Sequence, residues 1–316
     1  MKTVLIYLIN SLWDFVRGLK HNYNSPLEAG PKRLYYQIVI VSHTIEKGLS
    51  LENPRPGFGK QKIEQLIGLM DRYDGSLGDF PMGMARGALS KYVSHHRDLG
   101  IQDPVVDRVE AYVEASRAKV QCLETGGLKL IDGAVTGQGA LDRRFSCRAY
   151  AMQKVAESQV REIVARAQRA PSQCNRQSTR VHCYQEPADI RRLLTLQGGS
   201  AGFVESVPNL FVVTSELAAW GGPGQRNQAY VDGSLFAMCL MLACVDAGLQ
   251  CCPLNLAKTN RAEMALARAA GIPVDQRLIM MIAFGRCDLE PMKAAASPRL
   301  APDEVLTLYP GGGCDE

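Results

Sequence analysis

The sequence predicts an α+β protein in which an all-helical N-terminal region precedes a domain of strands and helices. Three observations carry this prediction. Apolar residues recur with helical spacing through residues 1–125, glycines concentrate at 126–139, and β-branched apolar runs alternate with helical segments through residues 140–316. We therefore predict a helical region at 1–125, a glycine-rich linker at 126–139 and a second domain at 140–316.

Composition is that of a globular protein and excludes several classes of function. Of 316 residues, 46% are hydrophobic, and the net charge of +4 comes without a basic run, so nucleic acid is not expected as a partner. The ten cysteines are scattered and lack zinc-site spacing, so we predict no metal and reduced thiols in a cytoplasmic protein. No segment is expected to reach the roughly 18–20 apolar residues of a membrane span.

The first twenty residues contain a short apolar run, Val4–Ile9, followed by Leu12, Trp13 and Phe15. No small-residue cleavage site follows, which is unlike a signal peptide. We interpret residues 1–20 as an amphipathic helix packed on the protein or on a partner. The alternative is peripheral membrane contact, with Trp13 and Phe15 inserted into the inner face of a membrane.

Helical spacing and end signals predict four more helices in the first region, over residues 34–46, 60–73, 84–98 and 104–122. Asp103 before Pro104 reads as an N-cap followed by proline at the first helical position. His43 and Glu46 are interpreted as part of a hydrogen-bonded cluster between helices; the alternative is a small site for an anionic ligand. His95 and His96 are expected at a solvated helix end.

The most informative stretch lies at Arg143–Arg148, where Arg144, Ser146 and Arg148 occupy alternate positions. Alternate side chains of an extended segment point the same way. Two guanidinium groups and a hydroxyl on one side of the backbone suit a phosphate group. An isolated Arg-x-Ser-x-Arg is more often a solvated strand edge, so the residues C-terminal to it decide between the two interpretations.

After this stretch comes an amphipathic helix, Glu157–Arg169, and then a loop at Pro171–Asn175. The order of a phosphate-type segment, a helix and a Pro-Ser-x-x-Asn loop resembles the FMN-dependent nitroreductase family over about residues 137–309. The resemblance implies a mixed or antiparallel sheet flanked by helices. It also implies an FMN cofactor, NADH or NADPH as electron donor, and a homodimer with its sites at the subunit interface.

Further elements support the second domain. Strands are expected at 181–184, 209–214, 249–254 and 277–284, and helices at 187–196, 227–247 and from 260 onward. The helix at 227–247 is apolar on nearly all sides, which predicts burial at a subunit interface. Its Asp232 and Asp246 are interpreted as polar contacts.

The resemblance also assigns cofactor-binding residues. Those implied are Arg144, Ser146, Arg148, Pro171, Ser172, Gln173, Asn175, Cys252, Pro253, Leu254 and Arg299. Backbone N–H groups near Cys252–Leu254 would meet the flavin N5 edge. Many relatives place a Lys-x-Arg pair at the phosphate, but Ser297 stands at the lysine position here, which Arg143 or Lys293 could compensate.

The expected function is that of an FMN-dependent NAD(P)H oxidoreductase. Flavin N5 would carry the hydride to a small-molecule acceptor, nitroaromatic or quinone-like in vitro, and no side chain need act as a catalytic acid or nucleophile. Two alternatives stay open. One is a non-catalytic flavin- or nucleotide-binding module that docks a partner, and the other is a redox enzyme acting on a glycan or lipid-linked intermediate.

Overall fold

The structure, a computed structural model, describes residues 30–117, 123–131, 139–220, 223–287 and 291–309, with helical fragments at 4–6, 8–9, 11–12 and 15–16. The chain forms two compact units, each built from separated stretches. The helical unit comprises residues 29–49, 56–128 and 295–316. The sheet unit comprises residues 1–28, 50–55 and 129–294.

The predicted helix near the N-terminus is described only as fragments between Val4 and Val16. Its large apolar side chains are exposed, including Leu8 at 63% and Phe15 at 62%. Trp13 lies outside the described residues. The predicted packing of this helix on a protein or a membrane therefore stays a prediction.

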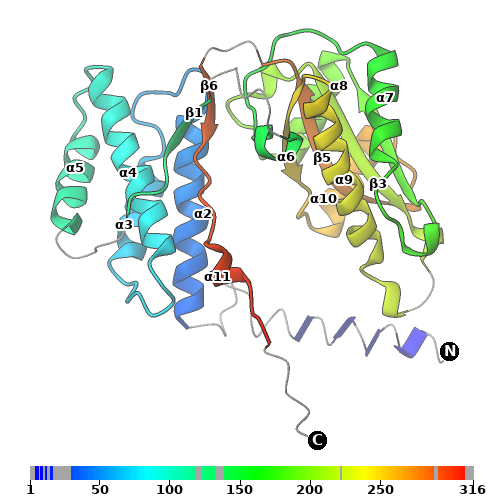
Figure 1. Ribbon diagram of the computed structural model, residues 1–316, viewed down its shortest axis with the longest axis horizontal. Coiled ribbons are helices and arrows are strands. Elements are labelled where there is room, and N and C mark those ends of the chain that lie inside the picture. The colour runs from blue at the N-terminus through cyan, green and yellow to red at the C-terminus, as the bar shows by residue number, and fades with distance from the viewer. Residues whose placement is uncertain are drawn as a thin grey trace, which may run out of the picture. The chain divides into compact units, whose positions relative to one another are not determined.

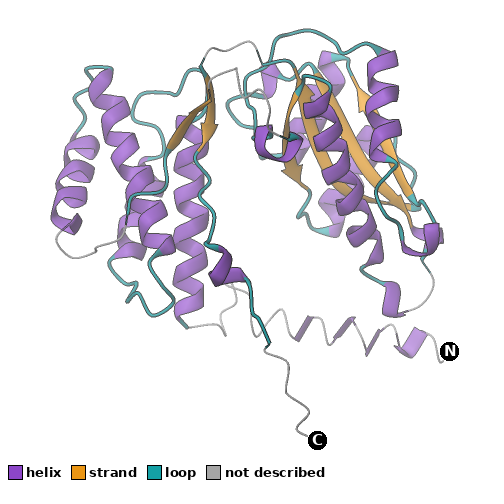
Figure 2. Cartoon of the chain, viewed as in Figure 1, coloured by secondary structure: helices purple, strands orange, loops and turns teal. Residues whose placement is uncertain are grey.

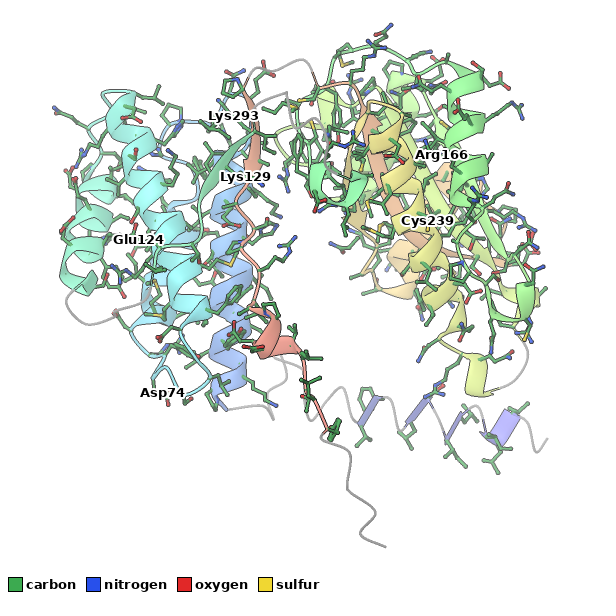
Figure 3. All side chains as sticks on the ribbon, viewed as in Figure 1. Asp74, Glu124, Lys129, Arg166, Cys239 and Lys293 are labelled. Carbon is green, nitrogen blue, oxygen red and sulfur yellow. The ribbon has the colours of Figure 1, made fainter. Side chains whose placement is uncertain are left out.

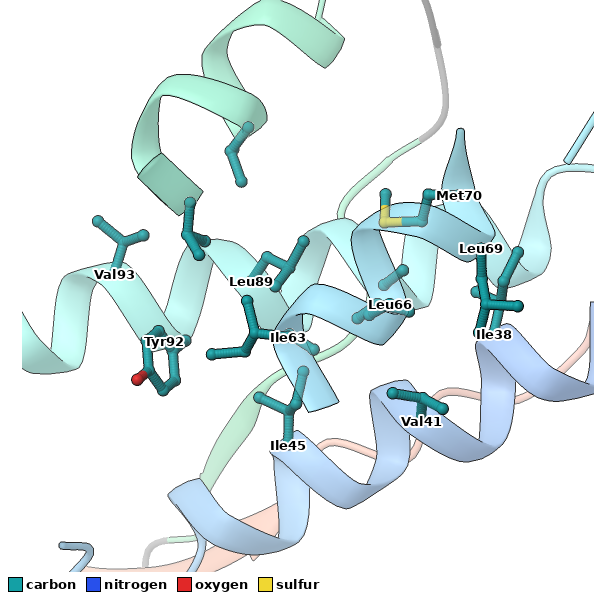
Figure 4. Packing of buried hydrophobic residues seen from close by; sticks show 14 of the residues in the cluster. Ile38, Val41, Ile45, Ile63, Leu66, Leu69, Met70, Leu89, Tyr92 and Val93 are labelled. Carbon is teal, nitrogen blue, oxygen red and sulfur yellow. The ribbon is translucent and has the colours of Figure 1, made fainter. Parts of the chain in front are cut away.

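Four of the described helices form the core of the helical unit: α2 (Pro31–Leu49), α3 (Lys60–Met70), α4 (Phe80–Asp98) and α5 (Pro104–Arg117). Each of them buries an apolar stripe in one core cluster, where Ile38 and Ile45 of α2 meet Ile63 and Leu66 of α3 (Figure 4). The α5 start is as predicted, because Asp103 Oδ1 accepts a hydrogen bond from the Val105 N–H at 2.9 Å.

His96 corrects one sequence expectation, because its side chain is only 1% exposed rather than solvated. Its Nδ1 donates to the Tyr92 carbonyl at 2.8 Å, and its Nε2 accepts from the Gly57 N–H at 3.0 Å. The neutral imidazole thus joins α4 to the loop before α3. The Glu46 carboxylate bonds His43 Nδ1 of the same helix and the Gly127 N–H of the segment after α5, both at 2.9 Å. These bonds form a polar cluster, but they do not join two helices, so the interhelical interpretation stays a prediction.

Backbone runs directly against backbone where the segment after α5 crosses α4. A Cβ placed on Gly126 would lie 2.0 Å from the Met84 carbonyl oxygen. A Cβ on Gly87 would lie 2.3 Å from the Gly126 nitrogen. Only glycine permits this approach, because neither backbone can rotate away as a side chain would.

We expect Gly126→Ala to destabilise the helical unit by about 3 kcal/mol, since overpacking against backbone forces the segment away from α4. Gly68→Ala is the matched control. Gly68 lies in α3, and a Cβ added to it would have no atom within 4 Å, so alanine should stabilise the helix by up to about 1 kcal/mol. Urea denaturation followed by circular dichroism measures both. Equal midpoints for the two variants would contradict the close packing.

The sheet unit holds a four-stranded antiparallel sheet in the order β2-β3-β5-β4. Its strands β3 and β5 are labelled in Figure 1. The strands are β2 (Thr179–Tyr184), β3 (Asn209–Glu216), β4 (Gln250–Asn255) and β5 (Gln276–Gly285). Strand alternation supplies a core on each face. Leu210 and Val212 of β3 enter one cluster, while Phe211 and Val213 enter the other. The α+β class predicted from the sequence is therefore correct.

Helices cover both faces of the sheet (Figure 2). The cluster that contains Phe211 receives α7 (Glu157–Ala167) and α9 (Gln228–Asp246), and the opposite cluster receives α8 (Pro187–Gln197) and α10 (Asn260–Ala270). Phe211 stacks on Phe284 with ring centroids 4.0 Å apart. The sheet face that carries Phe211 thus packs against α9, the long helix that positions the candidate site.

Helix α9 meets the length and hydropathy of a membrane span, with 56% of its apolar window buried inside the protein. This corrects the expectation that no segment reaches such a length. One side of α9 remains uncovered: Val231 is 49% exposed and Leu235 43% exposed. Met238, Cys239 and Leu242 continue that side with half-buried side chains.

The remaining described elements are short. Strand β1 (Leu128–Ile131) pairs with β6 (Met292–Ala295), and α6 (Ala140–Arg143) and α11 (Pro302–Val305) are single turns. Part of the predicted 126–139 linker is thus a strand, and residues 132–138 lie outside the described residues. The units also divide the chain differently from the prediction, because residues 50–55 belong with the sheet and residues 295–316 with the helices.

Candidate functional site

The Arg144–Arg148 segment runs beside the edge of β4 that does not pair with β5. Ser146 forms a parallel bridge with Cys251, and the Cys147 N–H donates to the Cys251 carbonyl at 3.2 Å. The segment is extended, as predicted, from Arg144 onward, where the backbone leaves α6. The predicted phosphate residues and the predicted flavin-edge strand are therefore neighbours.

Arg144 and Ser146 present unused polar groups. Arg144 is half-buried, and no described residue accepts a hydrogen bond from its guanidinium or forms an ion pair with it. The Ser146 hydroxyl likewise has no hydrogen-bond partner among the described residues. A half-buried cation without a counter-ion beside a hydroxyl donor is an electrostatic environment that favours an anion.

Arg148 differs from Arg144 because its side chain is largely buried, at 6% exposure. Its Nη1 donates to Ser50 Oγ at 3.0 Å and to the Ser146 carbonyl at 3.3 Å. Neither Nη2 nor Nε bonds a described residue, and neither is sealed from solvent. One end of the guanidinium is thus fixed, and the other end can receive a ligand oxygen.

The thiols around this segment are protonated at neutral pH. Burial raises the pKa of Cys251 to about 12, which the nearby Arg144 charge partly opposes. The pKa of Cys147 is raised further, first by its hydrogen bond with Cys287 and then by burial. A protonated thiol is a poor nucleophile, and both Cys251 and Cys252 are buried in β4.

The orientation of β4 decides which backbone groups reach its unpaired edge. Cys251 directs its carbonyl toward Cys147, so by strand alternation Pro253 and Asn255 face the same edge, while Cys252 and Leu254 pair with β5. Pro253 has no N–H. The next donor along that edge is therefore the Asn255 N–H, one residue beyond the predicted Cys252–Leu254.

The Pro171–Asn175 loop lies between α7 and β2 and is held in an uncommon conformation. Cys174, Asn175 and Gln177 have φ values of 51°, 54° and 50°, a region that costs non-glycine residues free energy. A cavity of about 420 Å³ adjoins the loop and is lined in part by Pro171, Ser172 and Asp232. A strained backbone conformation of this kind persists only where contacts with neighbouring residues keep the loop in place.

Asp232 of α9 supplies those contacts. Its side chain is 4% exposed, and its Oδ2 accepts from the Ser172 hydroxyl at 2.7 Å and from the Gln173 N–H at 2.9 Å. Its Oδ1 accepts from Gln228 Nε2 at 2.7 Å. Because the only proton of the Ser172 hydroxyl goes to Asp232, this hydroxyl holds the loop and can offer a ligand only a lone pair.

The two predicted parts of the site lie at opposite ends of α9 within one chain. The loop bonds Asp232 near the start of α9, whereas Arg143, next to Arg144, bonds Asp246 at its end at 3.0 Å. Fourteen residues separate these carboxylates, which corresponds to about 21 Å along a helix. Cys239 marks the middle of this helix in Figure 3.

The predicted contacts from the tail are engaged elsewhere. Arg299 belongs to the helical unit and donates to the carbonyls of Ser297 and Pro298. Arg143 bonds Asp246 and the Val245 carbonyl. Lys293 Nζ donates to the Glu52 carbonyl at 3.5 Å. Arg143 and Lys293, the two residues proposed to compensate for the missing lysine, therefore both have other partners.

Comparison with known proteins finds one family match, within the sheet unit. Residues 141–200 and 195–286 match the sequence profile of the nitroreductase family. No curated protein sequence matches the chain at a significant level.

Solved structures similar to the chain include NfrA2 of Bacillus megaterium, with 17% identity and a TM-score of 0.48, covering 55% of this chain and 74% of that one. A nitroreductase-like protein of Streptococcus mutans has 17% identity and a TM-score of 0.47, covering 54% and 96%. An FMN-dependent nitroreductase of Clostridium difficile has 18% identity and a TM-score of 0.42, covering 48% and 87%.

Proposed function

Residues 141–200 and 195–286 match the nitroreductase family, and from this match we propose that the protein is a homodimeric FMN-dependent NAD(P)H oxidoreductase. The observation that carries the proposal is the half-buried Arg144, which has no counter-ion among the described residues and lies in one extended segment with Ser146 and Arg148. This donor set fits a phosphate monoester, because it combines two permanent cations with a hydroxyl donor.

In the proposed arrangement the chain's own groups bind and orient the cofactor. Arg144, Ser146 and the unused nitrogens of Arg148 hold the phosphate, and the unpaired edge of β4 offers the Asn255 N–H and the Pro253 carbonyl to the ring. FMN, when bound, would supply the redox chemistry between NADH or NADPH and a quinone-like or nitroaromatic acceptor. The buried, protonated Cys147 and Cys251 thiols take no part in this chemistry.

The dimer completes the site in this proposal. A loop about 21 Å away along α9 is poorly placed to meet a flavin on the Arg144 segment of its own chain. If two copies of α9 pack antiparallel across their exposed sides, the loop of one protomer approaches the Arg144 segment of its partner. The exposed Val231 and Leu235 provide an apolar surface for that packing.

A non-catalytic flavin-binding module is the second candidate. Ser297 stands where many relatives have a lysine, and the Arg299 guanidinium donates to the carbonyls of Ser297 and Pro298. The phosphate site would then contain fewer cations than in those relatives, which favours a module that binds flavin without turnover. Steady-state oxidation of NADH or NADPH with a quinone acceptor distinguishes the two. Bound FMN without turnover would support the module and contradict the oxidoreductase.

Titration with FMN and with riboflavin, which lacks the phosphate, tests the proposed phosphate site. We expect Arg144→Gln to weaken FMN binding by about 10- to 150-fold, the equivalent of one charge-assisted bond worth about 1.5–3 kcal/mol. Riboflavin affinity should be unchanged. Arg161→Gln is the control, because Arg161 is 77% exposed on α7. A wild-type protein that binds neither flavin would rule the proposal out.

A further inference from the structure

A short stretch from the first half of the chain is built into the sheet unit. Residues 50–55 cluster with the sheet although the helices before and after them do not. Leu51 packs against the core cluster that α8 and α10 cover. A Cβ on Gly202 would lie 2.7 Å from Leu51 Cδ1, so the glycine leaves room for this leucine. We refer to residues 50–55 as the inserted segment.

The inserted segment begins at the residue that holds Arg148. Ser50 is 2% exposed, and its Oγ accepts from Arg148 Nη1 at 3.0 Å. On the main-chain side, the Arg148 carbonyl accepts from Ser206 Oγ at 3.2 Å. Arg148 is therefore fixed at its backbone and at one guanidinium nitrogen, while Nη2 and Nε bond no described residue.

The two arginines of the motif, Arg144 and Arg148, differ in how firmly their guanidinium groups are held. Arg144 has no described side-chain partner that fixes its guanidinium, so binding an anion must order it. Arg148 is already ordered by Ser50, and in an extended segment its side chain leaves the backbone on the same side as that of Ser146. An arginine that is ordered before the ligand arrives loses less side-chain entropy on binding.

We propose that Ser50 is a positioning residue of the FMN site, supplied by the inserted segment and acting through Arg148. The inference rests on the proposed function, in which Arg148 contacts the cofactor phosphate. It gives the N-terminal half of the chain an indirect part in cofactor binding, through Arg148. Ser50 itself does not touch the cofactor.

The test measures the FMN dissociation constant of the full-length protein by quenching of flavin fluorescence, together with the melting temperature of the apoprotein. Ser50→Ala should raise the dissociation constant about five- to tenfold. Ser50→Thr, which keeps the hydroxyl, should restore most of the affinity. Ser94→Ala is the control, because Ser94 lies exposed on α4 in the helical unit.

A double-mutant cycle shows whether Ser50 acts through Arg148. In an Arg148→Gln background, Ser50→Ala should change FMN affinity less than twofold. A merely structural serine would lower the melting temperature of the apoprotein and leave FMN affinity per folded molecule unchanged, which would overturn the inference. Full affinity in the Ser50→Ala variant would overturn this inference alone, whereas a wild-type protein that binds no FMN would overturn the proposed function as well.

Discussion

Replacing Leu235 by aspartate is expected to separate the proposed homodimer into monomers and to abolish tight FMN binding in the same step. Leu235 is 43% exposed on the uncovered side of α9. A carboxylate at the centre of an apolar interface is buried without a partner, which costs several kcal/mol. The dimer dissociation constant should rise by more than about a thousandfold, since each 1.4 kcal/mol is tenfold.

Light scattering after size-exclusion chromatography measures the mass of the variant, and FMN titration measures the site. Leu196→Asp is the matched control, because Leu196 is 40% exposed on α8, away from the α9 surface. A Leu235→Asp protein that remains dimeric would refute α9 as the interface. A monomer that binds FMN as tightly as wild type would refute a site shared between protomers.

Replacing Asp232 by alanine is expected to destabilise the sheet unit by about 3 kcal/mol and to weaken FMN binding. The substitution removes the acceptor for three donors, and each buried donor left without a partner costs about 1–3 kcal/mol. Without those bonds the left-handed residues Cys174 and Asn175 can relax toward ordinary backbone conformations.

Asp246→Ala is the control on the same helix. Asp246 is 34% exposed and pairs with Arg143 and Arg166, and ion pairs at the surface contribute at most about 1 kcal/mol. Thermal unfolding by circular dichroism compares the two variants. If Asp232→Ala loses no more stability than Asp246→Ala, Asp232 does not hold the loop.

Local signals predicted most of the elements. The apolar stripe of α3 and the β-branched run of β3 are encoded within a few residues, so spacing alone finds them. The burial of His96 could not be found this way, because it depends on Gly57, which lies 39 residues away in the sequence. The pairing of β1 with β6 joins two four-residue strands from distant parts of the chain, and neither strand is long enough to show alternation.

The sequence revealed the short motifs of the candidate site, but it did not reveal which distant residues hold those motifs in place. Arg144, Ser146 and the Pro171–Asn175 loop carry short signatures in the sequence. Ser50 holds Arg148 from 98 residues away in the sequence, and no local pattern marks such a contact. Asp232 was interpreted as a polar contact, since a buried carboxylate requires donors. Its partner Ser172, 60 residues away, could not be identified from the sequence.

The inserted segment has a consequence for biosynthesis. Ser50 leaves the ribosome 98 residues before Arg148, an interval of roughly 5–20 s at ordinary elongation rates. During that interval the core cluster that Leu51 joins is incomplete, so helices α2–α5 would fold while the apolar Leu51 is still exposed. A nascent chain paused within this window is the form that chaperones would be expected to engage.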